Sequence, residues 1–238
     1  MAGADIDLRA ISAFEVQTTA DTAGGGVIGV GKSQATVDMG DATTTATIET
    51  KASLTAGRDV IVIALNNHKL SAIARALGGG ALAGGQIAYT SAKVDNDVNV
   101  VVGKDVVILA RGAIAVTADS QTTASTDSYA VAGGAGAGAD SNNTFDSTLR
   151  GTRIGSSGDH AQRGVTIGGG SELTGTTVDI VAQVSYVDLL AKARAEAYAF
   201  FVASAFADAY LDVFSDVFVN VLEGTKRTTI TGTRGVDI

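Results

Sequence analysis

GRDVIVIA at residues 57–64 is the stretch that decides the fold, because similar phrases return along the whole chain. Each copy has a glycine, two further residues, and then an apolar–x–apolar alternation that leads to an alanine. The other full copies are GADIDLRA at 3–10, GKDVVILA at 103–110 and GTTVDIVA at 175–182, and a shorter RGVDI lies at 234–238. A phrase that recurs in phase indicates a protein built from structural repeats.

The phase of these copies predicts where each repeat begins. The first apolar residues of the copies are Ile6, Val60, Val106, Val178 and Val236. An apolar residue five or six positions before an anchor forms a second phrase, at Leu54, Val100, Leu173 and Ile230. We therefore expect one continuous array with units at about 6–59, 60–105, 106–177 and 178–235. Because the first and last residues lie at the same repeat phase, we expect the chain to be a piece of a longer one.

Segment 191–221 tests whether these repeats are strands or helices. Its alanine content favours a helix. However, apolar and small residues occupy its odd positions, while polar residues recur at even ones. Alternation of period two indicates a strand. Segment 25–37 has a small-residue face in the same way, and glycine-rich elements lie in the middle of the units, at 23–31, 76–85 and 130–139. We expect an all-β, elongated β-solenoid, similar to a parallel β-helix, with a thin Ala/Gly-rich interior.

The composition is consistent with paired strands around a thin core. The chain has 238 residues, of which 45% are hydrophobic and only 5% are aromatic, with 30 Gly and no Pro, Cys or Trp. Proline would remove hydrogen bonds from a sheet, so its absence suits a chain spent in strands. The net charge of −8 argues against nucleic acid as a partner. The most apolar stretch, 186–222, is interrupted by charged residues, so we expect no membrane insertion.

The phrases also carry a resemblance. The Gly-Gly-Gly element with its small-residue alternation at 24–37, followed by TTATIETKASLTAGRDVIVIA at 44–64, resembles the β-strand repeats of very large bacterial surface adhesins, the filamentous-haemagglutinin-like class. The resemblance covers nearly the whole chain as four units. It implies a passive stalk that projects a binding tip. The fourth unit departs from the pattern, because Phe200, Phe201 and Phe206 stand where other units have glycines.

Residues that could carry catalysis are sparse. His68 and His160 sit among polar residues without metal-ligand spacing, and we expect both at the surface. The polar segment 140–160 offers oxygen ligands of the kind that Ca²⁺ accepts, at Asp140, Asn142, Asn143 and Asp146. It matches no known calcium loop, and an ordinary solvated insertion is favoured. We therefore predict no catalytic, cofactor-binding or metal site, and no enzyme.

Aromatic residues are concentrated in the fourth unit. The possible interaction face consists of Tyr198, Phe200, Phe206, Tyr210, Phe214 and Phe218, which share the even positions of one strand pattern with Tyr186. One interpretation is a locally thicker core, or a sheet that packs on a neighbouring layer. The other is an exposed face that binds a partner, because large exposed apolar patches usually mark interaction sites.

These patterns favour a structural and adhesive role. We expect a stalk or spacer segment of a bacterial cell-surface or secreted filament, located outside the cell. Its partners would be the neighbouring repeats of the parent chain, further copies of itself, and a host or environmental surface ligand. The alternative is a carbohydrate-binding or carbohydrate-processing β-helix, but the Asp residues are spread over the units rather than clustered in one groove. We expect Asp59 and Asp105 to occupy equivalent positions, as do Asp7, Asp179 and Asp237, which indicates a structural role. Ordered threonine rows that bind ice, as at 43–47, are too few and irregular.

Overall fold

The structure is a computed structural model that describes the backbone of residues 3–150, 164–217 and 219–238, and their side chains except at 40–41, 95–96, 143–150 and 212–216. The described chain is all-β and contains no helix. Its strands are β1 (Ile6–Gly24), β2 (Ile28–Ile48), β3 (Ser53–Ala56), β4 (Val60–Gly79), β5 (Ala83–Val102), β6 (Val107–Ala110), β7 (Ile114–Arg150), β8 (Val165–Ile167), β9 (Glu172–Asp216), β10 (Val219–Val221) and β11 (Thr229–Asp237). They belong to one 11-stranded, nearly closed sheet.

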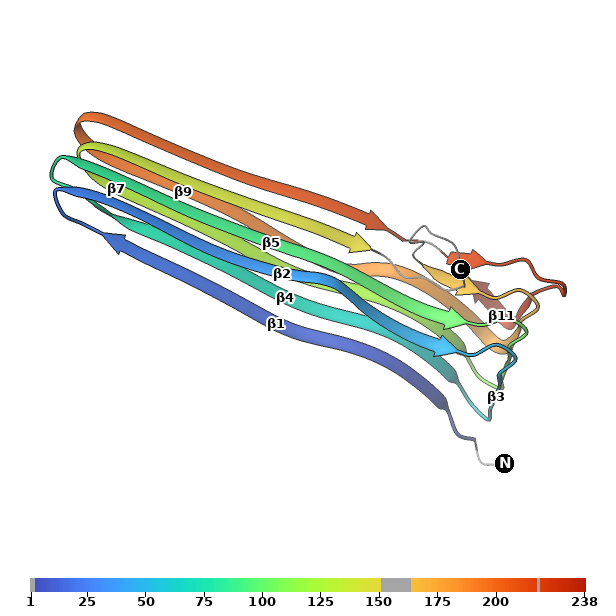
Figure 1. Cartoon of the computed structure of the whole chain (residues 1–238). Coiled ribbons are helices and arrows are strands. Elements are labelled where there is room, and N and C mark those ends of the chain that lie inside the picture. Colours follow the sequence, from blue (N-terminus) through green and yellow to red (C-terminus); the bar gives the residue numbers. More distant parts are fainter. Residues whose placement is uncertain (1–2, 151–163, 218) are drawn as a thin grey trace.

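All of the strand pairs are parallel and form long ladders. The chain runs outward along β1, turns, and runs back along β2, so that two long arms lie next to each other (Figure 1). The first arms pair in the order β1, β4, β7 and β9, and the second arms pair in the order β2, β5 and the later halves of β7 and β9. Parallel pairing requires the chain to travel back before each new strand begins. In this protein the return arm is itself a strand, and it pairs with the return arms of the neighbouring circuits.

The ladder register defines one circuit of the chain. Ile6 pairs with Val60, Val60 pairs with Ile114, and Ile114 pairs with Val178. We number the circuits one to four, at 6–59, 60–113, 114–177 and 178–235, and the last is bounded by Val236, which pairs with Val178. Four of the five expected anchors therefore lie in one row of the ladder, namely Ile6, Val60, Val178 and Val236.

The third anchor does not coincide with the register. Ile114, and not Val106, lies opposite Val60. The phrase GKDVVILA instead forms β6, in which Ile108 pairs with Leu54 of β3 and with Leu173 of β9. The boundary expected at 105/106 therefore lies at 113/114. The reason is that two short apolar segments lie close together here, one that begins at Val106 and one that begins at Ile114. The segment at Val106 matches the recurring phrase better, although the segment at Ile114 pairs with Val60.

The interior has two parts that differ in side-chain size. At the end where β3, β6, β8 and β11 lie, the core consists of Val, Ile and Leu side chains such as Val62, Ile108 and Ile167, all 0% exposed. Between the long arms the core is mostly alanine, with Leu70 and a few valines. Small side chains let the two arms approach closely, and the hydroxyls of Ser128 and Ser141 hydrogen-bond across the gap at 2.7 Å. This confirms the expected thin interior of the arms.

Segment 191–221 is strand up to Asp216 and again at β10, as its alternation predicts. In the first arm of β9, alanines at odd positions pair with buried residues of β7 and face inward, as Ala195 does opposite Ala130. Tertiary pairing with β7 thus overrides the helix propensity of alanine. The expected small-residue face of 25–37 is confirmed from Gly29 to Val37, whereas Val27 is 62% exposed because it lies in the turn between the arms.

Candidate functional site

The aromatic residues of β9 whose side chains the structure describes are exposed at the surface and do not form a thicker core. Phe200 is 93% exposed and Phe201 is 85% exposed. These two side chains lie at the tip of the arms, where the neighbouring circuit has Gly134 and Gly136 opposite Ala199 and Val202. The substitution of bulky residues for small ones noted in the sequence is therefore a feature of the tip.

The expected aromatic face is divided by this tip. Tyr198 lies on the first arm and is 62% exposed, whereas Phe206 and Tyr210 lie on the second arm at 68% and 59%. Because the inward sides of the two arms face each other, their outward sides point in opposite directions. The even positions therefore do not form one surface, since the chain reverses between them. Phe206 pairs with Asp140, so it does not replace a glycine. The side chains of Phe214 and Phe218 lie outside the described residues.

A groove of about 470 Å³ lies beside the tip. It is lined by Gly80, Ala81, Gly133, Gly134 and Ala135 from the second and third circuits, and by Tyr198, Ala199 and Phe200 from the fourth. The lining therefore combines small residues of two circuits with two aromatic residues of a third. This groove is the described hollow to which the predicted aromatic residues contribute most directly.

Polar contacts hold the tyrosines near the groove. The Tyr198 hydroxyl donates to Glu196 Oε2 at 2.6 Å, and this hydrogen bond raises the pKa of Tyr198. Burial, followed by the charge of Glu196, raises the pKa of Tyr129 on the adjacent strand. The Arg194 guanidinium lies 5.4 Å from the centre of the Tyr129 ring and 3.6 Å from Asp127. An exposed pair of this kind contributes little to stability, but it orients the side chains.

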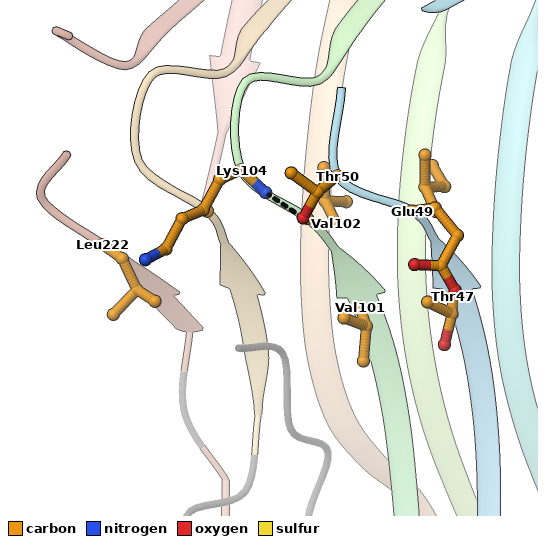
Figure 2. Close-up of a pocket in the computed structure, with 10 residues that line it drawn as sticks. Thr47, Glu49, Thr50, Val101, Val102, Lys104 and Leu222 are labelled. Carbon is orange, nitrogen blue, oxygen red and sulfur yellow. Dashed lines mark hydrogen bonds between the residues drawn. The ribbon is translucent and has the colours of Figure 1, made fainter. Parts of the chain in front are cut away.

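A second hollow, of about 400 Å³, lies at the other end of the arms (Figure 2). It is lined by the ends of β2 and β5 and the turns that follow them, by Gly168 and by Leu222. The backbone amide of Lys104 donates to Thr50 Oγ1 at 3.3 Å, which links the turns of two circuits. Of the residues that line this hollow, only Glu49 and Lys104 are ionisable. This hollow could not be predicted from the sequence, because the residues that line it are far apart along the chain.

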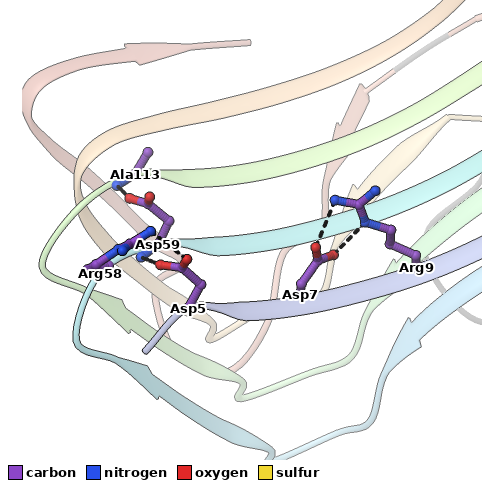
Figure 3. A network of polar contacts seen from close by, with 6 residues as sticks. All are labelled: Asp5, Asp7, Arg9, Arg58, Asp59 and Ala113. Carbon is purple, nitrogen blue, oxygen red and sulfur yellow. Dashed lines mark hydrogen bonds and ion pairs between the residues drawn. The ribbon is translucent and has the colours of Figure 1, made fainter. Parts of the chain in front are cut away.

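Aspartates near the anchors connect consecutive circuits (Figure 3). Asp5 accepts hydrogen bonds from the Asp59 amide at 3.1 Å and from Arg58 at 2.8 Å. Asp59 in turn accepts from the Ala113 amide at 2.7 Å. The positional equivalent of Asp59 is therefore Asp5, and the expected equivalence with Asp105 is wrong. These carboxylates bond the backbone of the next circuit and thereby serve the stacking.

Asp7 lies nearby and belongs to a different position in the circuit. It accepts two hydrogen bonds from Arg9, both at 2.7 Å, and these lower the pKa of Asp7 (Figure 3). The ladder places it at the position of Asp179, and Asp179 pairs with Asp237. The expected equivalence of these three aspartates is thus confirmed.

His68 is buried, which corrects the expectation that it lies at the surface. It is 0% exposed and faces inward from β4. Its ring lies 4.1 Å from that of Phe14, and its Nε2 is 3.2 Å from Ser12 Oγ. Burial of His68 could have been predicted, because the inward residues of this strand are the even positions counted from Val60. The polar residues around it in LNNHKL hide this alternation. His160 lies outside the described residues.

The polar segment 140–160 also differs from the expected solvated insertion. Its first part, up to Arg150, continues β7 and pairs with β5 and β9. Of its candidate oxygen ligands, Asp140 is exposed at the surface, where it lies opposite Phe206. The residues from 151 to 163 lie outside the described chain. Within the described residues, no group of three or more His, Cys, Asp or Glu side chains is arranged to hold a metal ion.

Comparisons with family models, curated proteins and solved structures return no match for this chain. No helix in the described part of the chain has the length and apolar character needed to cross a membrane.

Proposed function

We propose that this chain is a segment of an elongated β-solenoid that serves as a stalk or spacer in a filamentous bacterial cell-surface or secreted protein. The observation that carries the proposal is the parallel ladder, in which the described arms of each circuit pair with those of the previous circuit along most of their length, with register shifts between Asp38 and Asp41, between Ser120 and Gln121, and between Gly134 and Gly136. Such a stack grows along one axis as circuits are added. Such an elongated shape is suited to a spacer.

Burial in the middle of the stack supports this role. Val60, Val62 and Ala64 of the second circuit are 0% exposed, whereas the equivalent residues of the first circuit, Ile6, Leu8 and Ala10, are only partly covered. One circuit alone cannot bury its apolar face, and its neighbours complete the burial. The first partners of each circuit are therefore adjacent circuits. The hydrogen bonds of Asp5 and Asp59 join neighbouring circuits, so these carboxylates have a structural role. We propose that the segment is not an enzyme.

Removing one whole circuit tests the proposal. Deletion of residues 69–122 joins His68 to Thr123, the ladder partner of Lys69, and so preserves both register and alternation. We expect the shortened chain to remain all-β and to unfold cooperatively by circular dichroism. Deletion of 70–122 is the matched control, because one more residue is retained and every following side chain of the arm would face the wrong side.

The control should be much less stable than the circuit deletion. Equal stability of the two deletion variants, or an unfolded circuit deletion, would contradict a modular spacer.

Carbohydrate binding is a second candidate, and the tip groove is the observation that favours it. Tyr198 and Phe200 offer aromatic faces for the apolar side of a sugar ring, and Glu196, which accepts a hydrogen bond from Tyr198, adds a polar group beside them. Pockets for small molecules commonly combine aromatic walls with a few polar groups. Calorimetric titration with cellohexaose and chitohexaose tests this candidate. Heat of binding that disappears in Phe200→Ala would support it, and the absence of heat with both sugars would exclude binding of these classes.

A further inference from the structure

The turns between the outgoing and returning arms lie side by side at the tip of the four circuits (Figure 1). Each of these turns lies within a stretch that contains no charged residue, at 22–31, 76–92, 128–139 and 197–207. The turns at the other end of the arms differ, because they contain charged residues such as Glu49, Arg58, Lys104 and Asp105. Charged residues are therefore excluded from the tip in every circuit.

Large apolar side chains are exposed at this uncharged tip. Those that are more than half exposed include Val27, Ile28, Leu82, Phe200, Phe201 and Val202. Leu82 belongs to the second circuit, and its backbone is hydrogen-bonded to Val27 of the first circuit and to Gly136 of the third. Its side chain is nevertheless 64% exposed. Because circuits lie on both sides of Leu82, its exposure results from its place at the tip. Exposed apolar patches of this kind usually mark a contact surface.

Hydrogen bonds between circuits satisfy backbone groups of the tip. The amides of Ala81 and Leu82 donate to the carbonyl oxygens of Gly26 and Val27, both at 2.9 Å. The amide of Gly136 donates to the carbonyl oxygen of Leu82 at 3.1 Å. Backbone groups that enter the hydrocarbon of a bilayer need partners within the protein, because acyl chains offer none. Consecutive turns supply such partners to each other.

We propose that the tip inserts into the hydrocarbon of one leaflet of a lipid bilayer. Glu196 lies five residues before Phe201, which corresponds to about 16 Å along a strand, and one leaflet contributes about 15 Å of hydrocarbon. The depth of the uncharged zone therefore matches one leaflet. Acyl chains suit this surface better than a polar partner does, because the turns expose apolar side chains and no charge. The inference rests on the tip and does not depend on the stalk role.

Amphipathic and charged side chains lie where the uncharged zone ends. One row of the ladder at this boundary contains Asp21, Arg75, Tyr129 and Arg194. Tyr198 lies inside the zone, and its hydroxyl donates to Glu196 at the boundary. Tyrosine is common at the interface between membrane and water, because its ring is apolar and its hydroxyl is polar. The boundary of the tip therefore has the residue types that suit the headgroup layer.

Shallow insertion of turns places weaker demands on the sequence than a segment that crosses a bilayer. The charged residues of 186–222 led us to expect no membrane insertion, because a crossing segment must be apolar over its whole length. The charges nearest the tip, Glu196 and Asp208, lie on either side of the uncharged stretch 197–207. They can stay in the headgroup layer while the turn alone enters the leaflet. For the tip, this inference replaces that expectation.

Flotation with vesicles of pure phosphatidylcholine tests the inference. These vesicles carry no net charge that would attract or repel a chain of net charge −8, and they carry no sugar. The tip variant, Leu82→Asp with Phe201→Asp, places two carboxylates at exposed positions that do not line the groove beside the tip. The control variant, Ile11→Asp with Leu190→Asp, adds the same charge away from the tip, at side chains that are 58% and 45% exposed.

We expect the original chain and the control variant to float with the vesicles. The tip variant should bind about tenfold more weakly or less, because a carboxylate must leave water to enter hydrocarbon. The inference is overturned if the original chain does not float, if the tip variant floats as well as the original chain, or if the control variant loses binding equally. An original chain that forms dimers in sedimentation analysis and does not float would assign the tip to a contact between copies instead. Circular dichroism checks that both variants are folded.

A dye at the tip gives a second measurement that needs no charged substitution. Because the chain has no cysteine, Leu82→Cys and Thr123→Cys can each carry a single nitrobenzoxadiazole dye. Vesicles should shift the emission of the dye at position 82 to shorter wavelength, and a quencher on the acyl chains should reduce it. The dye at position 123, in the middle of the first arm of β7, should not respond. A dye at position 82 that stays in water would overturn the inference, and a folded circuit deletion would then leave the solenoid standing.

Discussion

A Cβ atom at Gly29 would lie 2.5 Å from the carbonyl oxygen of Gly79 in the next circuit. The obstacle is backbone, so it cannot move aside as the end of a side chain could. A Cβ at Gly79 would in turn lie 2.4 Å from the carbonyl oxygen of Gly133. Glycine therefore recurs near the tip because consecutive circuits approach closely there.

Gly29→Ala should consequently lower the free energy of unfolding by about 1–3 kcal/mol, the usual cost of overpacking. Gly138→Ala is the matched control, since its added Cβ would meet no atom within 4 Å. The control should leave stability unchanged or raise it by about 0.4–1 kcal/mol through the loss of unfolded-state entropy. Urea titration of both variants measures the difference. Equal stability of Gly29→Ala and the original chain would refute the close approach.

The sequence predicts these glycines better than it predicts His68. The glycine runs imply a thin interior by composition alone. His68 required the alternation to be counted from Val60 through polar neighbours, which places it inside beside Phe14. Polar residues with partners inside a narrow core give no simple hydropathy signal.

At the scale of elements, side-chain size sets the cross-section of each circuit. Val, Ile and Leu fill the end with β3 and β6, and alanine lets the long arms close on each other. The aromatic residues of β9 belong to neither core. The sequence predicted that β9 is a strand, because its alternation is long. It could not show that the turn at Phe200 divides the aromatic positions between two faces, because alternation continues unchanged through the tip.

Substitutions in the wide core and substitutions of the aromatic residues at the tip should differ strongly in their effect on stability. Ile108→Ala should cost about 2–5 kcal/mol, because Ile108 is 0% exposed in the wide core. Phe200→Ser and Phe201→Ser should change stability by no more than about 0.5 kcal/mol, because both rings are exposed. Denaturant midpoints at equal protein concentration give the comparison. A loss in the phenylalanine variants similar to that in Ile108→Ala would mean that the tip is packed against another part of the chain.

Across the whole molecule, each circuit pairs in parallel with the previous one, and the register shifts at only a few positions of the described ladders. The recurring phrases predicted repeats, and they predicted the phase of every circuit but the third. Phrase similarity alone could not distinguish Val106 from Ile114, because both begin apolar segments. Only the pairing of complete arms selects between them.

Spin labels test this register most directly, and the absence of cysteine from the chain makes the labelling specific. The structure pairs Lys69 with Thr123, so labels at these positions should lie on strands about 4.8 Å apart and show strong dipolar broadening. Phrase alignment would instead place Lys69 opposite Ala115. That residue lies eight positions from Thr123, or about 26 Å along the strand, so a label there should show no broadening with Lys69. Singly labelled chains at low concentration provide the baseline. Broadening for Lys69 with Ala115, and none for Lys69 with Thr123, would contradict the parallel ladder of β4 with β7.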